Sequence, residues 1–290
     1  MRIIAPSTPG GAADTFARLL ADHLPDVLGG RFFVENRAGA GGLIGTQAAA
    51  GAEPDGYTFV TSSVAYHAIA PAMSPHPGFH PLRDFTHIAY IGGPPNVFVV
   101  NPRLGVRSLA ELADLARGAP VGYVSPGVGT LGHLTAERFA ELAHVRLQHI
   151  PYKGASAAMM DLVAGTVGLG TMTWTSALGQ IRAGAVIPIA ITSRARLAEF
   201  LDLPTFKELG YDDLVTTTWF GLSGPAGVPG EIVGRLNRAV IEVLQADDVR
   251  KLLQQDAIET RPMAPEEFTT FVAAEIDRWT PLARQAGRTN

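Results

Sequence analysis

Short apolar runs and amphipathic stretches alternate along this chain, and the alternation predicts an α/β fold. Apolar runs of about four to eight residues are typical of buried strands, whereas apolar residues recurring at helical spacing indicate amphipathic helices. Strands are expected at 2–5, 32–35, 57–60, 87–91, 97–100, 121–124, 147–150, 169–172 and 187–192. Helices are expected at 16–24, 43–48, 131–143, 155–163, 176–183, 232–244, 247–255 and 265–286, and after Ser108. Such alternation implies parallel sheets with helices on both faces.

The strand–helix series runs twice, which predicts two lobes. The last, mostly helical segment packs most economically back on the first lobe, so the chain is expected to cross near Asn101-Pro102 and again near 218–221. The predicted lobes are therefore 1–100 with 221–290, and 101–220. Ligands of open α/β sheets bind at the carboxyl ends of the strands, which places the expected site in a cleft between the lobes.

Composition narrows the classes of partner. Hydrophobic residues make up 47% of the chain and charged residues 17%, as in globular proteins. The net charge is −4 and no basic run is present, so nucleic acid is not an expected partner. No apolar stretch approaches the length that inserts into a membrane. Cysteine is absent, which excludes disulfides, thiolate metal sites and a cysteine nucleophile.

Catalytic signatures are also missing from the sequence. It contains no G-x-S-x-G elbow, P-loop, H-E-x-x-H motif or EF-hand loop. His76 and His80 are four residues apart, but Pro77-Gly78 between them prevents the helix that would direct both toward one metal. We therefore expect a protein that is not an enzyme, with no catalytic residue, no metal and no cofactor.

The first candidate site is a glycine-containing turn after the first strand, at Pro9-Gly10-Gly11-Ala12-Ala13-Asp14. Glycines allow backbone N–H groups to face a ligand, and the helix that begins here adds unpaired N–H groups and a partial positive charge. Together these form an anion site that needs no lysine or arginine. Asp14 has a competing role in capping the helix. The candidate ligand contacts are Thr8, Gly10, Gly11, Ala12 and Asp14.

The second candidate site follows the strand at 121–124. Gly127, Gly129 and Gly132 form a G-x-G-x-x-G pattern between a strand and a helix, which suggests a dinucleotide site. The next strand, 147–150, ends without the acidic residue that holds a ribose, so a second anion-binding turn is preferred over a nucleotide-dependent oxidoreductase. The candidate contacts are Ser125, Gly127, Val128, Gly129, Thr130 and His133.

Three further groups of polar or aromatic residues lie at strand ends. A strand-to-helix junction carries Tyr152, Lys153 and Gly154, with a structural turn as the alternative. The small hydroxyl groups of Ser62 and Ser63 suit polar contacts in a cleft. For His67 and His133, packing inside the fold is the alternative to contact with a ligand. Trp174 and Trp219 are placed to wall a pocket, although core packing is common for tryptophan. The additional candidate contacts are Ser62, Ser63, His67, Tyr152, Lys153, Gly154, Met172, Thr173 and Trp174.

An ordered set of motifs across the whole chain resembles the Bug family, the solute receptors of tripartite tricarboxylate transporters. The likeness rests on the following segments: Pro9-Gly10-Gly11 with Asp14, Ala17 and Arg18; Val34-Glu35-Asn36-Arg37; Gly39, Gly41 and Gly42; Pro54-Asp55-Gly56-Tyr57-Thr58; Pro95-Asn96-Val97; Gly129-Thr130 with His133-Leu134; Pro151-Tyr152-Lys153-Gly154; Trp219-Phe220-Gly221-Leu222; and Pro225-Ala226-Gly227.

The resemblance implies a two-lobed type II periplasmic binding protein, the Venus flytrap fold, with two doubly wound sheets joined by a hinge. It implies a small carboxylate held by backbone amides and waters at Gly10–Ala12 and Gly127–Thr130, and delivery to membrane transporter subunits. It also implies a periplasmic protein whose signal peptide has been removed; a native start at Met1 is the alternative. A monomer is expected, and a ligand sensor for a signalling receptor is a further alternative.

Departures from the family pattern bear on the ligand. Gly165-Thr166-Val167-Gly168 lacks the acid usual in this stretch, and Met172 stands where another acid is frequent. An acidic group there would suit a ligand ammonium, whereas a thioether would not. We therefore expect a di- or tricarboxylate or an aromatic carboxylate in preference to an amino acid. Ser7 and Val128 also depart from the usual residues.

Overall fold

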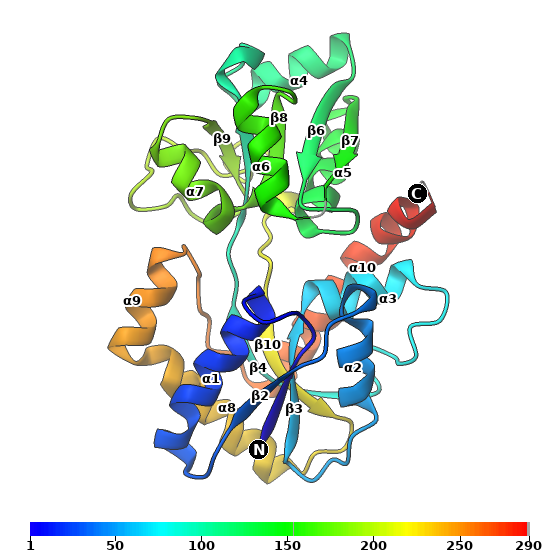
Figure 1. The fold of residues 1–290 in the computed structure, drawn as a ribbon, viewed down its shortest axis with the longest axis vertical. Helices are drawn as coiled ribbons and strands as arrows, with labels where there is room; N and C mark the ends of the chain where they lie inside the picture. Colours follow the sequence, from blue (N-terminus) through cyan, green and yellow to red (C-terminus); the bar gives the residue numbers. More distant parts are fainter. Residues whose placement is uncertain (153, 289–290) are drawn as a thin grey trace. The chain divides into compact units, whose positions relative to one another are not determined.

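The computed structural model describes residues 1–152 and 154–288. These residues form two compact units, Met1–Gly93 with Trp219–Arg288, and Pro94–Thr218, each built on its own five-stranded sheet (Figure 1). The chain therefore passes from one unit to the other twice. Among the described helices, none has the length and apolar character needed to span a membrane.

The first unit has the strand order β2-β1-β3-β10-β4. Strands β1, β2 and β3 run parallel, and β10 runs antiparallel to both of its neighbours. The strands are β1 (Arg2–Ala5), β2 (Phe33–Asn36), β3 (Thr58–Ser63), β4 (Phe85–Gly92) and β10 (Phe220–Pro225). The helices are α1 (Ala12–Leu28), α2 (Leu43–Ala50), α3 (Ala70–Met73), α8 (Gly230–Gln245), α9 (Asp247–Gln255) and α10 (Pro265–Arg288), with a 3-10 turn η1 (Ala40–Gly42) and a π-helical segment η2 (Ala65–Ile69).

The second unit has the strand order β7-β6-β8-β5-β9. Strand β6 runs parallel to β7 and β8, and β5 runs antiparallel to β8 and β9. The strands are β5 (Asn96–Val100), β6 (Val121–Ser125), β7 (Leu147–Pro151), β8 (Leu169–Thr173) and β9 (Ile187–Ile191). The helices are α4 (Leu109–Gly118), α5 (Leu131–Ala143), α6 (Ala155–Ala164) and α7 (Trp174–Arg182), with 3-10 turns η3 (Pro102–Leu104) and η4 (Asp212–Leu214).

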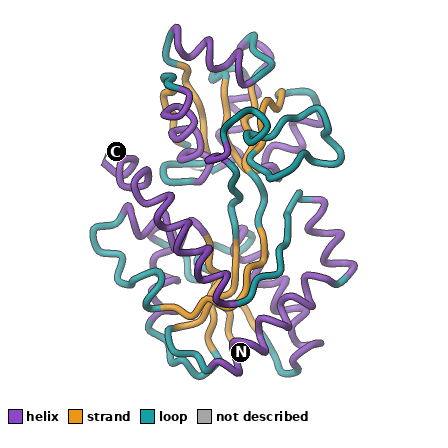
Figure 2. The backbone as a smooth tube through the Cα atoms, turned by 180° about the vertical axis from the view of Figure 1, so that it is seen from behind, coloured by secondary structure: helices purple, strands orange, loops and turns teal. Residues whose placement is uncertain are grey.

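Helices cover both faces of each sheet because alternate strand residues point to opposite faces. In the first unit, Ile3 packs in one core with α1 and α8, whereas its neighbour Ile4 packs in another core beside Ala49 of α2. Figure 2 shows the long helix α10 lying across the sheet of this unit, where it contacts β4. In the second unit, Phe98 and Tyr123 share a core with α4 and α5. The other face of this sheet is covered by α6, which contacts β6 and β8, so helices cover both faces of each sheet and the α/β class is confirmed.

The structure corrects two expectations about the sheets. Both sheets are mixed, because β5 and β10, the strands that follow the two crossings, run antiparallel to their neighbours. The strand expected at 97–100 was assigned to the first lobe, yet β5 pairs with β8 and β9, so the first crossing lies after Gly93. Periodicity predicts a strand but does not say which sheet it joins.

Candidate functional site

In the first unit, hydrogen bonds within the turn between β1 and α1 hold the first candidate site. Gly11 is the N-cap of α1, and Gly10 has a left-handed φ of 79°, which favours glycine. The Gly11 N–H donates to the Thr8 carbonyl oxygen at 3.1 Å. The Gly10 N–H donates to Asp14 Oδ2 at 2.8 Å. The two N–H groups expected to face a ligand are therefore already used inside the turn.

The Asp14 carboxylate is buried beside this turn and accepts several hydrogen bonds. Besides the Gly10 N–H, its carboxylate accepts from Arg18 Nε at 3.0 Å and from Asn36 Nδ2 at 2.8 Å. The Arg18 hydrogen bond, with those from Gly10 and Asn36, outweighs burial and lowers the pKa of Asp14 to about 2. The structure thus favours the competing role: Asp14 holds the turn, and direct contact with a ligand is not expected of it.

The N–H group after those of Gly10 and Gly11, that of Ala12, remains available to a ligand. Ala12 is the first residue of α1, and the first N–H groups of a helix have no partner within it. Ala12 is exposed, and among the described residues its N–H has no hydrogen-bond partner. The positive end of the α1 dipole adds to its attraction for an anion.

Ser62, Ser63 and His67 lie in the interior of the first unit, which corrects their expected place at a ligand. All three are fully buried. The Ser62 hydroxyl oxygen accepts from Ser223 Oγ at 3.0 Å, and the His67 ring packs 4.7 Å from that of Phe85. Burial, aided by nearby His87, keeps the pKa of His67 well below its usual value. Ser62 and Ser63 are enclosed because β3 is a central strand covered on both faces, and His67 is enclosed on η2, the segment that follows β3.

In the second unit, the turn from Ser125 to Thr130 is closed by its own side chains. Ser125 Oγ accepts the Gly127 N–H at 3.2 Å, and Thr130 Oγ1 donates to the Gly127 carbonyl at 2.8 Å. Thr130 is also the N-cap of α5, since its hydroxyl accepts the N–H of His133. Gly129, with a left-handed φ of 74°, donates its N–H to His133 Nδ1 at 3.1 Å. Among the described residues, the Val128 N–H is the one in this turn that makes no hydrogen bond.

Three stacked rings, those of Tyr123, His149 and His133, pack beside this second turn. The rings of His133 and His149 are 3.9 Å apart and nearly parallel, and Tyr123 stacks 4.9 Å from His149. His149 Nε2 is 2.7 Å from Ser125 Oγ. Burial lowers the pKa of His133 to about 3 and that of His149 to about 4, so both rings are neutral near pH 7. The sequence analysis does not include His149 among the candidates. Its place on the strand that follows the glycine-rich turn was the available signal.

The turn also packs against the loop between β7 and α6. The Gly154 N–H donates to the Pro126 carbonyl at 2.8 Å, and a Cβ on Gly127 would approach the Tyr152 carbonyl oxygen to 3.1 Å. The Tyr152 hydroxyl donates to Asp161 of α6. The structure thus joins the loops that carry Gly127 and Tyr152, as a shared site requires. The candidate Lys153 lies outside the described residues.

At the end of β8, only one of three candidates is accessible. Met172 and Trp174 are buried, so the expectation that their side chains contact a ligand is not supported. Thr173 is partly exposed, and its hydroxyl lies 2.8 Å from Ser176 Oγ and 3.2 Å from Thr175 Oγ1. The sequence analysis includes Thr173 but misses Thr175 and Ser176, because small polar residues at a helix start also serve as caps.

The glycine pattern of the second turn has a packing explanation. A Cβ on Gly132 would lie 2.7 Å from the Thr171 carbonyl oxygen, so glycine allows α5 to pack closely on β8. Strand β7 ends at Pro151 and supplies no acid for a ribose. The oxidoreductase alternative therefore gains no support from this site.

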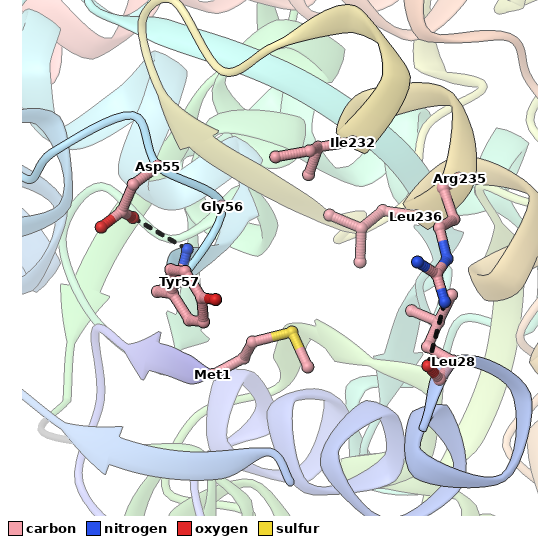
Figure 3. A pocket seen from close by; sticks show the side chains of 8 residues that line it. All are labelled: Met1, Leu28, Asp55, Gly56, Tyr57, Ile232, Arg235 and Leu236. Atoms are coloured by element: carbon pink, nitrogen blue, oxygen red, sulfur yellow. Dashed lines mark hydrogen bonds between the residues drawn. The ribbon is translucent and has the colours of Figure 1, made fainter. Parts of the chain in front are cut away.

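A cavity of about 250 Å³ lies elsewhere in the first unit (Figure 3). It is lined by Met1, Leu28, Asp55, Gly56, Tyr57, Ile232, Arg235 and Leu236. Met1 and Tyr57 directly precede β1 and β3, so the cavity lies at the amino ends of these strands. Turns that bind ligands in α/β sheets lie at the carboxyl ends, which sets this cavity apart from the candidate site.

The family model described as tripartite tricarboxylate transporter family receptor matches residues 16–288. The chain belongs to this receptor family. BugT of Bordetella pertussis is 35% identical over 290 residues, which cover 99% of this chain and 89% of that protein. The resemblance that the motifs indicated is thereby confirmed.

Solved structures of other solute-binding proteins have the same fold as this chain. Rpa4515 of R. palustris with adipate superposes with a TM-score of 0.84 at 33% identity, covering 99% of this chain and 97% of that one. The periplasmic binding protein BugD gives 0.80 at 30% identity, covering 99% and 97%. MatC of Rhodopseudomonas palustris with bound malate gives 0.80 at 29% identity, covering 98% of each chain. Like them, this receptor has the fold of a periplasmic solute-binding protein.

Proposed function

We propose that this receptor captures a small di- or tricarboxylate, or an aromatic carboxylate, outside the cytoplasm and delivers it to the membrane subunits of a tripartite transporter. Each unit contributes one anion-binding turn, and capture occurs by closure of the units about the two crossing segments. The closed state must bind the ligand more tightly, because only differential affinity shifts such an equilibrium. The receptor acts as a monomer and carries out no chemical step.

The observation that carries the proposal is an unused backbone donor in the strand-to-helix turn of each unit. Ala12 begins α1 after β1, and Val128 lies in the turn between β6 and α5; neither N–H has a partner among the described residues. Strands β1 and β6 occupy the same position in their sheets. A helix start binds carboxylates without a cationic side chain. Adipate and malate, the ligands of two relatives, are dicarboxylates and would use one donor group at each end.

A thermal-shift screen tests the ligand class. The panel contains adipate, malate, succinate, citrate, terephthalate, benzoate and glutamate, with NAD as the control for a nucleotide enzyme. A ligand present at about 100 times its Kd stabilises the native state by about 2.7 kcal/mol, which raises Tm by several degrees. We expect a rise with a di- or tricarboxylate, or with terephthalate or benzoate. A rise with NAD alone, or tight binding of glutamate alone, would refute the proposal.

A variant at the first turn tests the donor itself. Ala12→Pro removes one N–H at a helix position that accepts proline, and Gly11 already has the extended φ and ψ that a following proline requires. We expect the affinity for the best ligand to fall about tenfold, the loss of one charge-assisted hydrogen bond. The matched control is Gly230→Pro at the first position of α8, which should bind normally. Equal affinities of the two variants would contradict the role of Ala12.

A further inference from the structure

His133 touches the second turn through a nitrogen that must be unprotonated. The Gly129 N–H donates to His133 Nδ1 at 3.1 Å, so Nδ1 is the acceptor and the ring proton is on Nε2. Since Gly129 is in the left-handed region, this hydrogen bond holds a conformation that the backbone does not strongly prefer. A proton on Nδ1 would place two donors face to face and remove the bond.

The surroundings of His133 keep its ring neutral. His149 stacks on it at 3.9 Å, so a charge on one ring opposes a charge on the other. Tyr123, whose pKa is raised by burial, stays protonated and donates to Glu137 Oε1 at 2.6 Å. Glu137 is the one carboxylate among the described residues recorded near the pair, with Oε1 3.9 Å from His133 Nε2. It favours a proton on His133, but it is engaged by the tyrosine and partly exposed.

We propose that His133 is a positioning residue of the ligand site, whose neutral ring, stacked on His149, holds the Ser125–Thr130 turn in its binding conformation, and that protonation of this pair releases the turn and the ligand. The role rests on the function proposed above, since it assumes that this turn binds the carboxylate. It differs from the ligand contact expected from the sequence, because the Nδ1 atom is used by the turn and the ring is buried.

The direction of the pH effect follows from the same contacts. Burial lowers the pKa of His133 to about 3 and that of His149 to about 4. The turn is therefore intact at neutral pH and is lost as the pH falls through this range. Adipate takes up protons in the same range, as carboxyl groups do, so the effect is isolated by comparing variants with one ligand.

Two substitutions separate positioning from packing. His133→Asn places an amide oxygen near the position of Nδ1 and cannot be charged, whereas His133→Phe keeps an aromatic ring and removes the acceptor. Binding of adipate is measured by titration calorimetry from pH 7.5 to pH 3, a range that includes the titration of both rings. We expect His133→Phe to weaken binding about tenfold at pH 7.5. We expect His133→Asn to stay within about threefold at pH 7.5 and to lose less affinity than the parent protein as the pH falls.

The control is His144→Asn on the same helix. His144 is exposed at the C-terminal end of α5 in a left-handed conformation that asparagine tolerates, so binding and its pH dependence should be unchanged. Glu137→Gln removes the attraction for a proton on His133 and should move the loss of affinity to lower pH. Unchanged binding in His133→Phe, or a parental acid loss in His133→Asn, would overturn the proposal.

A ligand-free measurement separates this proposal from the proposed function. Amide hydrogen exchange of Gly129 should be slow in the parent protein and in His133→Asn, and at least tenfold faster in His133→Phe. If adipate does not bind but this order is found, the positioning role stands and the choice of ligand fails. If all three proteins exchange alike, the positioning role fails whether or not adipate binds.

Discussion

At the residue scale, Asp14 and His133 show how polar side chains at a ligand-binding turn become part of its support. Both belong to motifs that indicated ligand contact, and both are buried with their polar atoms turned toward the backbone of their own turn. A sequence pattern identifies the turn, but it does not separate a residue that touches the ligand from one that holds the turn. Only the direction of each hydrogen bond makes that distinction.

Replacing Asp14 should weaken the first unit. Asp14→Ala leaves the Gly10 N–H without its acceptor and removes one of the two acceptors of the Asn36 amide, and we expect the free energy of unfolding in urea to fall by about 2 kcal/mol. Because the pKa of Asp14 is lowered to about 2, this contribution is complete above pH 4 and is lost as the pH falls through 2. The control is Asp22→Ala, an exposed position of α1. Equal effects of the two substitutions would refute this role.

At the element scale, β10 is the part of the fold that the sequence did not predict. The segment Phe220–Pro225 is buried along its whole length and carries two glycines and a proline, so it lacks both the alternation and the β-branched residues of a strand. It nevertheless pairs with β3 and β4 in the sheet. The tertiary structure overrides the weak local preference because the chain returning from the second unit fills the gap between two existing strands.

Gly221 tests how closely β10 is packed. A Cβ at this position would lie 2.3 Å from Phe268 Cζ and 2.8 Å from the Ala89 carbonyl oxygen, so both α10 and β4 would have to move. We expect Gly221→Ala to lower the free energy of unfolding by about 2 kcal/mol, measured by urea denaturation. Gly230→Ala, where no atom lies within 4 Å, serves as the control and should be neutral or slightly stabilising. A neutral Gly221→Ala would show that the sheet has more room than this packing allows.

At the scale of the whole molecule, three buried histidines and the partly buried His149 make stability depend on pH. Burial lowers the pKa of His87, His133 and His149 to about 4, 3 and 4, and that of His67 well below its usual value. The unfolded chain binds protons at these sites from about pH 6.5 downward, whereas the folded chain does not. Their contribution is therefore complete above pH 6.5 and falls as the pH drops toward 4.

Urea denaturation at pH 7.5, 6 and 5 measures this dependence. Each buried histidine adds up to about 1.4 kcal/mol per pH unit to the slope between its unfolded and folded pKa values. His23, whose pKa is raised mainly by the Leu19 carbonyl, acts in the opposite sense and reduces the slope. His133→Asn should lower the slope, and His144→Asn should not. Stability that is flat from pH 7.5 to pH 5 would contradict the burial of these rings.

The two units also repeat one design. In both sheets, a first strand and its two parallel neighbours end where helices begin, and an antiparallel strand that follows a crossing is fourth in order. The sequence predicted the two series of strands and helices and the receptor family. It did not predict the strand order that the two sheets share, because β5 and β10 complete each sheet with a segment from beyond a crossing.

By itself, the sequence determined the α/β class, the two-fold series, the family and the two glycine-containing turns. These depend on local periodicity and on backbone conformations that only certain residues adopt. The tertiary structure decided which N–H groups remain for a ligand, that Ser62, Met172 and Trp174 are buried, and that His149 supports the second turn. Burial and hydrogen-bond partners come from segments far apart in the chain, and no local pattern encodes them.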